Sequence, residues 1–186
     1  MRVVAGRLRG RVLKAPPGDA TRPTGARVKE ALFSILGDVA SSRVLDLYAG
    51  SGALGIEALS RGASFGVFVE AGRPALTALR DNLTKLDLLG SSQVLPVRVE
   101  TAHTRLQREG PFDLTLCDPP WRDALTALEQ LQTLAGLGVF SAQARVVLEH
   151  SAKDPIASRA GAGALVVTDE RRWGDTAVTL FTLNSA

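Results

Sequence analysis

The sequence has one cysteine, two histidines and no long apolar run. Because Cys117 stands alone, neither a disulfide framework nor a cluster of thiolate metal ligands is expected. His103 and His150 lack the spacing of metal ligands, so we expect no metal site. No apolar stretch approaches the roughly 20 residues that span a bilayer, and the N-terminus lacks the continuous apolar core of a signal peptide. These absences predict a cytoplasmic protein that interacts with no membrane.

Length and composition are those of an ordinary globular domain. The chain has 186 residues, of which 45% are hydrophobic and 22% are charged, and this is enough to bury a sizeable core. No internal repeat or low-complexity linker divides the chain. We expect a monomer in which residues 1–38 form a small extension of the main domain, residues 39–186.

Positive charge is concentrated in the first thirty residues. Their net charge is +6, whereas the rest of the chain has a net charge of −3. The cations of this segment are Arg2, Arg7, Arg9, Arg11, Lys14, Arg22, Arg27 and Lys29. Such a distribution is typical of a chain that docks on phosphate. A solvated tail is the alternative, but the interspersed apolar residues favour a hairpin.

The same segment has recognisable local patterns. Residues 2–5 and 11–14 are predicted to be short strands around a glycine-containing turn, and residues 15–18 interrupt regular structure. A helix is predicted to begin near Thr24, which could cap it, and to end at Gly37. Its apolar face is predicted from residues at helical spacing, namely Val28, Ala31, Leu32 and Ile35.

The rest of the chain alternates between apolar runs and helix-like stretches. The runs lie at 43–47, 65–69, 94–97, 114–117 and 145–148, and the helical stretches at 53–61, 73–86, 101–109 and 124–135. This alternation predicts a parallel, doubly wound sheet. Residues 164–168 and 177–183 then predict an antiparallel hairpin around a charged turn. A mostly parallel, seven-stranded α/β sheet with such a hairpin is the methyltransferase variant of the Rossmann fold.

A glycine-rich turn follows the first predicted strand. Gly50 and Gly52 permit a tight turn and a close approach of backbone to ligand, and with Gly55 they spell the G-x-G-x-x-G pattern. Glu70 ends the next strand, where it could accept hydrogen bonds from ribose hydroxyls. The pattern does not separate NAD from S-adenosylmethionine. Asp46 favours the latter, because its charge suits an ammonium or sulfonium group better than a pyrophosphate.

A second motif follows the fourth predicted strand. Asp118, Pro119, Pro120 and Trp121 lie at the carboxyl end of the strand, the edge where ligands bind in open α/β sheets. The Asp118 carboxylate and the Pro119 carbonyl are two acceptors suited to holding the exocyclic amine of a nucleobase. Trp121 has a flat face on which the base could stack. The motif therefore predicts methylation of an amino group, with catalysis mainly through orientation.

Taken together, these motifs resemble the RsmD family of small-subunit ribosomal RNA guanine-N2 methyltransferases over nearly the whole chain. The residues that carry the resemblance are 2–6, 9–11, 21–24, 27–33, 46–55, 57–63, Glu70 and 118–121. The resemblance implies S-adenosylmethionine as cofactor and methylation of guanine N2 in 16S ribosomal RNA (guanine 966 in the family's usual name). It also implies that the partner is this RNA within a 30S subunit or an assembly intermediate.

The resemblance assigns roles to particular residues. It implies that Arg22, Pro23 and Thr24 close over the methionine end of the cofactor and that Glu70 binds the ribose. Expected cofactor contacts also come from Asp46, Tyr48, Gly50, Gly52, Glu100 and Thr101, and expected RNA contacts from Arg7, Arg9, Arg11, Lys14 and Arg27. Glu100 departs from the family's usual Asp or Asn at the adenine-contacting position, and Trp121 replaces the common Phe or Tyr.

Several alternatives remain open at this point. A DNA or RNA amino-methyltransferase that acts on adenine N6 or cytosine N4 would use the same amine chemistry. A protein glutamine-N5 methyltransferase usually carries Asn where this chain has Asp118, and it needs no basic segment. An NAD-dependent oxidoreductase and a noncatalytic RNA-binding module are the alternatives from other classes.

Overall fold

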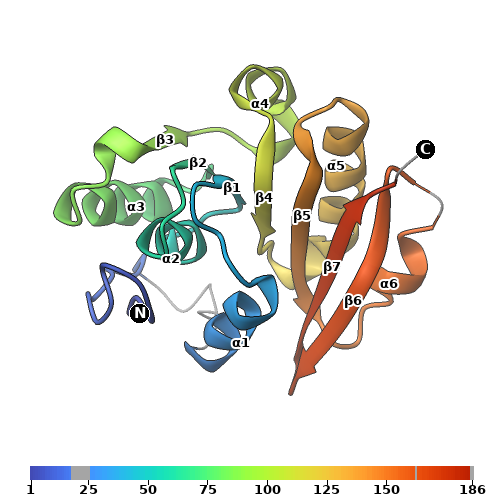
Figure 1. Ribbon diagram of the computed structural model, residues 1–186, viewed down its shortest axis with the longest axis horizontal. Helices are drawn as coiled ribbons and strands as arrows, with labels where there is room; N and C mark the ends of the chain where they lie inside the picture. Colours follow the sequence, from blue (N-terminus) through green and yellow to red (C-terminus); the bar gives the residue numbers. More distant parts are fainter. Residues whose placement is uncertain (18–25, 162, 185–186) are drawn as a thin grey trace.

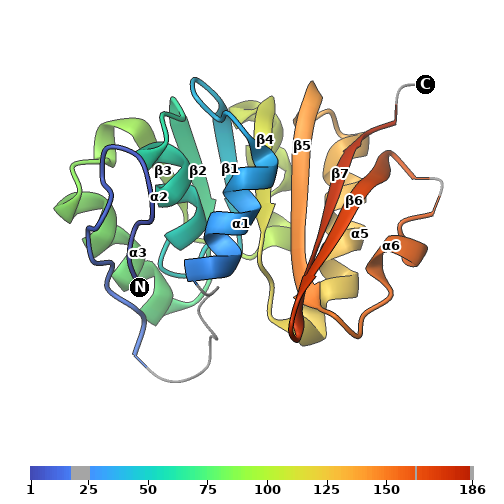
Figure 2. The same cartoon turned by 60° about the horizontal axis from the view of Figure 1, so that its bottom comes forward.

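The computed structural model describes residues 1–17, 26–161 and 163–184. Its centre is a seven-stranded sheet (Figures 1 and 2). The strands are β1 Arg43–Leu47, β2 Phe65–Val69, β3 Ser92–Leu95, β4 Phe112–Cys117, β5 Phe140–Ser151, β6 Leu165–Trp173 and β7 Thr176–Leu183.

Six α-helices and three short 3-10 turns lie within the described residues. The helices are α1 Ala26–Leu36, α2 Ala53–Ser60, α3 Arg73–Lys85, α4 His103–Glu109, α5 Ala124–Gly136 and α6 Ile156–Arg159, and the turns are η1 Leu89–Ser91, η2 Val99–Thr101 and η3 Trp121–Asp123. The longest, α3 and α5, have 13 residues each. None of the helices in the described part of the chain is therefore long and apolar enough to cross a membrane.

The strand order is β3-β2-β1-β4-β5-β7-β6. Strands β1 to β5 pair in parallel, whereas β7 is antiparallel to both β5 and β6. The predicted fold class is confirmed: the sheet is mostly parallel, and the C-terminal hairpin supplies the reversed strand.

Both faces of the sheet are covered, which explains why the strands are almost continuously apolar. Alternate residues enter opposite cores, so Val44 and Leu116 contact one cluster while Leu45 and Cys117 contact the other. The first cluster contains the apolar residues of α1, α2 and α3, and the second contains those of α4, α5 and α6. The result is three layers, with helices on either side of the sheet.

Several predicted boundaries were wrong. Strand β3 ends at Leu95 rather than at residue 97, because Pro96 has no N–H group with which to continue the ladder. Strand β6 extends to Trp173 through a register shift, although its charged second half hid it in the sequence. The helix expected at 101–109 is split into η2 and α4, and β5 is three times as long as the predicted run.

Residues 1–17, called the leader from here on, pack beside α2 and α3 at one end of the sheet (Figures 1 and 2). The expected pair of strands is reduced to one isolated antiparallel bridge between Arg2 and Val12. Backbone hydrogen bonds still join the two segments, from Val3 to Arg11 and from Leu13 to Met1. The pairing ends there because the N–H of Ala5 donates to the Glu57 carboxylate at 2.9 Å.

Helix α1 also differs from the prediction in the face that it buries. Leu32 is buried as expected, but Ile35 is 37% exposed, and Lys29 is only 3% exposed. The Lys29 ammonium lies 3.1 Å from the Glu57 carboxylate and donates to the carbonyl of Arg2. The ion pair between Lys29 and Glu57 therefore places Lys29 in the core, and the helix buries a different face from the one that its apolar spacing predicted. The helix ends before Gly37 as predicted, whereas the expected cap, Thr24, lies outside the described residues.

Candidate cofactor and active site

The candidate site lies at the carboxyl edge of the parallel strands. Because β1 to β5 run in the same direction, the loops after them meet at this edge. Strands β1 and β4 are neighbours in the sheet, although α2, β2, α3, β3 and α4 separate them in the chain. Such a reversal of strand order opens a crevice, and ligands of open α/β sheets bind there. Two segments flank this crevice: the loop after β1 with Gly50 and Gly52, called the glycine loop, and residues 118–121 after β4, called the Asp118 motif.

The loop after β1 has a backbone that only certain residues adopt easily. Gly50 and Gly52 have φ angles of 57° and 82°, in the left-handed region. A Cβ atom on Gly52 would lie 2.5 Å from a terminal methyl carbon of Leu79, so a larger residue would also have to displace this buried side chain. Tyr48 adopts φ 57° without being glycine, a strained conformation that tends to occur at functional sites. The loop then leads directly into α2.

Asp46 lies beneath this loop and is 2% exposed. Its Oδ2 atom accepts a hydrogen bond of 2.8 Å from the N–H of Gly55, which ties β1 to α2. Burial raises the pKa of Asp46 well above its usual value, the bond from Gly55 opposes this, and the negative charges of Asp118 and Glu70 raise it further. Asp46 therefore lies in a negative field that a cationic ligand would relieve.

Glu70 connects the end of β2 to the glycine loop. Its Oε2 atom accepts from the N–H of Gly50 at 2.7 Å, and its Oε1 atom accepts from the N–H groups of Ala71 and Gly72 at 2.9 and 2.6 Å. A carboxylate has about four acceptor sites, two on each oxygen, so Oε2 keeps capacity for one further donor. The predicted contact with ribose hydroxyls stays a prediction.

The Asp118 motif follows β4 at the same edge. The N–H of Asp118 donates to the carbonyl of Leu47 at 3.4 Å, which places the start of the motif beside the end of β1. Pro119 is buried, Pro120 is exposed, and half-buried Trp121 begins η3. Because the charge of Asp118 acts on Asp46, the structure brings the two predicted halves of the site together.

Tyr48, Glu100 and Thr101 form a second group at the edge. The Tyr48 hydroxyl is buried without a hydrogen-bond partner among the described residues. Burial raises its pKa, as do the charges of Cys117, Glu100 and Asp123. The Glu100 carboxylate pairs with Arg98 at 3.2 Å, and the Thr101 hydroxyl donates to the Arg98 carbonyl. Adenine binding by Glu100 stays a prediction.

The remaining predicted residues are peripheral or lie outside the described part. Arg22, Pro23 and Thr24 lie outside the described residues. The expected RNA contacts Arg7, Arg9, Arg11, Lys14 and Arg27 are all exposed. The first four belong to the leader, and Arg27 lies in the first turn of α1.

Two buried carboxylates were missed in the sequence. Glu57 is 0% exposed in the middle of α2, and Glu149 is 6% exposed near the carboxyl end of β5. Each follows an uninterrupted group of apolar residues, which is the signal that could have revealed it, since buried acids are rare unless they are paired or functional.

Comparisons with known proteins place the chain in a family. The family model described as Conserved hypothetical protein 95 matches residues 1–182. A Bacillus subtilis (strain 168) protein, provisionally named rRNA methyltransferase YlbH, is 37% identical over 188 residues, which cover 97% of this chain and 98% of that protein. Ribosomal RNA small subunit methyltransferase D of Escherichia coli (strain K12) is 34% identical over 155 residues, 83% of this chain and 76% of that protein.

A solved structure agrees with these sequence matches. The Escherichia coli protein yhhF, provisionally described as a methyltransferase, superposes with a TM-score of 0.82 at 32% identity. The match covers 100% of this chain and 99% of that one. The leader, the sheet and the C-terminal hairpin are thus all part of one shared architecture.

Proposed function

We propose that this chain, which belongs to the family of ribosomal RNA small subunit methyltransferase D (the RsmD family), methylates the exocyclic N2 amine of a guanine in 16S ribosomal RNA. S-adenosylmethionine is the methyl donor. The observation that carries the proposal is the position of Asp118 beside the glycine loop, in reach of the charge of Asp46.

The residues at the crevice fit this cofactor. Asp46, Glu70 and Asp118 concentrate negative charge there, and S-adenosylmethionine has a cationic ammonium and a cationic sulfonium. The left-handed backbone at Gly50 and Gly52 leaves no side chain between the loop and a ligand. The Oε2 atom of Glu70 has acceptor capacity for one ribose hydroxyl beside the loop. A pyrophosphate, as in NAD, would instead be repelled by these acids.

The cofactor supplies an electrophilic methyl group on a positively charged sulfur. The Asp118 carboxylate and the Pro119 carbonyl accept the two N–H groups of the base amine, so that the nitrogen lone pair points at the methyl carbon. When bound, S-adenosylmethionine would give up this methyl group to the nitrogen, and its sulfur would keep the electron pair of the broken C–S bond. The nitrogen would then lose a proton, and the Asp118 carboxylate would accept it. Trp121 stacks on the base and fixes its plane.

The proposed substrate rests on the positive charge of the leader and on the similarity to a named relative. The leader contributes exposed arginines that suit phosphate, and the Escherichia coli relative is named for the small-subunit ribosomal RNA. We expect the partner to be this RNA in a 30S subunit or an assembly intermediate, with the protein acting as a monomer in the cytoplasm.

The test is to incubate the purified protein and S-adenosylmethionine with undermethylated small-subunit particles and with their free RNA. Nucleoside analysis should find N2-methylguanosine, and Asp118→Ala should abolish it while the affinity for S-adenosylhomocysteine is kept. N6-methyladenosine or N4-methylcytidine as the product would replace the proposal with one of the other amino-methyltransferases. No methylation of either RNA form would contradict it.

A further inference from the structure

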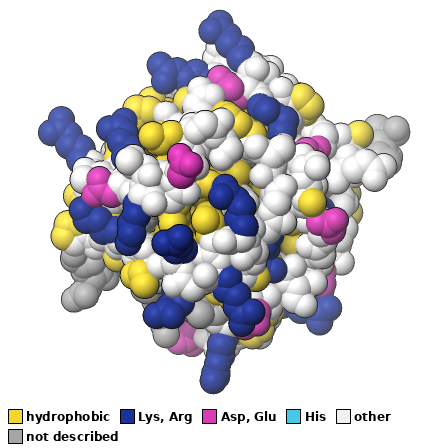
Figure 3. Space-filling view, turned by 60° about the vertical axis from the view of Figure 1, so that its left-hand side comes forward, with side chains coloured by type: hydrophobic (Ala, Val, Ile, Leu, Met, Phe, Trp, Pro, Cys, Tyr) yellow, Lys and Arg dark blue, Asp and Glu magenta, His cyan; other side chains and the backbone are white. Residues whose placement is uncertain are grey.

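Cationic side chains continue from the leader onto helix α3. The leader contains no acidic residue, and α3 contains only Asp81. Eight exposed cations lie on these two segments: Arg2, Arg7, Arg9, Arg11, Lys14, Arg73, Arg80 and Lys85. Figure 3 shows lysine and arginine side chains gathered over the face of the molecule to which both segments belong. This face therefore has the charge that a polyanion requires.

The leader and α3 are bonded to each other, so they form one surface. The N–H of Lys14 donates to Asn82 Oδ1 at 2.8 Å, and Asn82 Nδ2 donates back to the Lys14 carbonyl at 3.0 Å. Lys85 Nζ donates to the carbonyl of Val12 at 3.4 Å. The Lys14 ammonium also pairs with Asp81 at 2.6 Å, which neutralises the one acid of α3.

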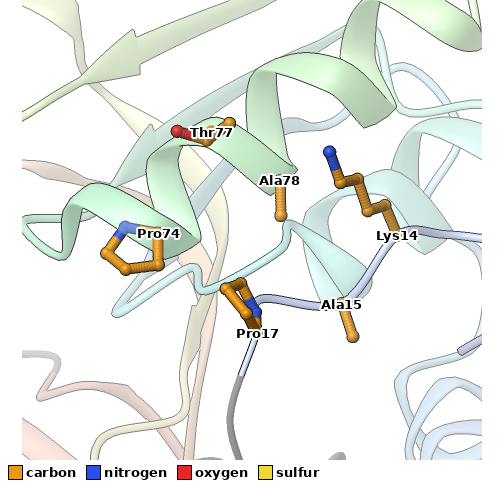
Figure 4. Close-up of a pocket in the computed structure, with 6 residues that line it drawn as sticks. All are labelled: Lys14, Ala15, Pro17, Pro74, Thr77 and Ala78. Carbon is orange, nitrogen blue, oxygen red and sulfur yellow. The ribbon is translucent and has the colours of Figure 1, made fainter.

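An apolar pocket lies at the junction of the two elements (Figure 4). Its volume is about 340 Å³, and it is lined by Lys14, Ala15, Pro17, Pro74, Thr77 and Ala78. Two proline rings and two alanines provide apolar walls, and Lys14, whose ammonium pairs with Asp81, also lines the pocket. An apolar pocket beside cations fits a nucleobase whose phosphates lie on the surrounding surface.

We propose that the leader and the outer face of α3 form a single RNA-binding surface in which this pocket receives an unpaired base. Arg80 and Lys85 extend the row of phosphate contacts that the leader begins. Proteins usually recognise RNA through bases that have left the helix. One such base in the pocket would anchor the RNA near the carboxyl edge of the parallel strands, called the catalytic edge from here on. The identity of the polyanion as RNA rests on the proposed function, whereas the surface does not.

The first experiment measures phosphate contacts. Arg80→Gln combined with Lys85→Gln is compared with Arg105→Gln combined with Arg108→Gln, two exposed cations of α4. Binding to a labelled 16S fragment is titrated over a range of salt concentrations. The α3 variant should lower the slope of log K against log salt by about 1.5, which is about 0.7 to 0.9 for each contact. Affinity for S-adenosylhomocysteine should not change. A slope equal to that of the α4 control would overturn the inference.

The second experiment tests the pocket with a matched pair on one helix. Thr77→Phe fills the pocket, whereas Thr84→Phe places the same ring on an exposed position away from it. Thr77→Phe should weaken RNA binding about tenfold with the salt slope unchanged, since no phosphate contact is lost. Equal affinity for the two variants would show that no base enters the pocket. A wild-type protein that methylates no RNA contradicts the proposed function instead, which is a separate result.

A second inference comes independently from Glu149. Strands β4 and β5 pair in parallel with Cys117 opposite Leu148, so Asp118 and Glu149 occupy the next positions of strands about 4.8 Å apart. Leu116 and Val147 contact the same core cluster. Because side chains alternate along a strand, the residues two positions later, Asp118 and Glu149, face the same side as well. Two acids thus lie side by side at the catalytic edge.

We propose that Glu149 determines the specificity for guanine by accepting its N1–H while Asp118 accepts an N2–H. Guanine has these two donors side by side, whereas adenine N1 and cytosine N3 are acceptors that a carboxylate repels. A pair of neighbouring carboxylates therefore matches the edge of guanine and of no other base. This inference rests on the proposed function for the identity of the target base.

The test uses RNA with 2-aminopurine in place of the target guanine, because this base keeps the N2 amine but has an acceptor at N1. We expect the wild type to prefer guanine by about a hundredfold in kcat/KM, since unpaired polar groups strongly disfavour the wrong substrate. Glu149→Gln, whose amide can donate to N1, should reduce the preference to about tenfold or less. Glu129→Gln on α5, an exposed position, is the matched control.

The outcomes distinguish a failure of the specificity role of Glu149 from a failure of the proposed function. If Glu149→Gln slows methylation of both RNAs by the same factor, Glu149 does not determine the base specificity. If the wild type methylates neither RNA, the proposed function fails and this inference fails with it. Affinity for S-adenosylhomocysteine, measured on each variant, reports whether the fold and the cofactor site are intact.

Discussion

Asp46 and Glu57 are two carboxylates that the same domain buries in opposite ways. Both are almost inaccessible, at 2% and 0% exposed. Asp46 accepts one described hydrogen bond, from the N–H of Gly55, and none of the described cations pairs with it. The charged groups that shift its pKa, Asp118 and Glu70, are acids.

Glu57 has the contrary environment. It pairs with Lys29 at 3.1 Å and with Arg61 at 2.9 Å, and it accepts the N–H groups of Val4 and Ala5. Its charge is compensated within the protein, where it connects α2, α1 and the leader. No described cation compensates the charge of Asp46, so protonation or a cationic ligand would relieve it. We infer that Glu57 stabilises the fold, whereas Asp46 serves to bind the cationic cofactor.

The largest test of this comparison is Glu57→Gln. Removing one member of a buried ion pair leaves Lys29 uncompensated, so the free energy of unfolding should fall by about 3–5 kcal/mol, measured by urea denaturation. Adding Lys29→Met should recover part of the loss. Affinity for S-adenosylhomocysteine should remain within about twofold. A strong loss of cofactor affinity in a folded Glu57→Gln protein would contradict the inference that Glu57 stabilises the fold and only Asp46 serves binding.

The next largest effect concerns the leader that Glu57 holds. A Cβ atom on Gly6 would lie 1.9 Å from the carbonyl oxygen of Ser60, whereas one on Gly10 meets nothing within 4 Å. Both glycines have positive φ angles, 78° and 84°. Gly10→Ala should therefore cost about 1 kcal/mol of stability, and Gly6→Ala about 3 kcal/mol, because the clash adds to the strain. Equal unfolding midpoints for the two variants would mean that the leader is not docked on α2.

Asp46→Asn tests the other acid. The amide oxygen can still accept from Gly55, and a buried charge is removed, so the melting temperature should not fall. Affinity for S-adenosylhomocysteine should decrease about tenfold, or about 1.4 kcal/mol, as measured by calorimetry. Asp87→Asn, an exposed acid after α3, is the control. A lower melting temperature with unchanged affinity would assign Asp46 to the fold instead.

The smallest effect is a pH dependence with opposite signs for stability and binding. Because the pKa of Asp46 is raised in the folded state, its protonation favours folding. The stability that Asp46 contributes is present below its unfolded-state pKa and is lost as pH rises through the folded pKa. Cofactor affinity should change the other way and fall a few-fold on acidification through the same window. Asp46→Asn should show a flatter profile, and identical profiles would mean that Asp46 does not titrate with binding.

Much of the fold was predictable because its determinants are local. Short apolar runs separated by helical stretches indicated the parallel sheet. The spacing of Gly50 and Gly52 predicted the tight turn between β1 and α2. The positions of Asp46, Glu70 and Asp118 at strand ends followed from the same alternation. The family was identified from these motifs, and the matches to its model and relatives confirm it.

What failed was decided by partners far away in the chain. The predicted strands of the leader end early because Glu57, more than fifty positions on, accepts the N–H of Ala5. Helix α1 buried Lys29 rather than Ile35 because the same carboxylate pairs with it. Neither effect has a periodicity that a sequence pattern could reveal.

The sequence by itself determined the order of the elements, the glycine loop, the Asp118 motif and the charge of the leader, since each depends on residue type and short spacing. Only the tertiary structure decided which acids are compensated, which cations share a face with α3, and that Glu149 stands beside Asp118. The physical reason is that burial and electrostatic compensation depend on distances in space, which strand order and helix packing set.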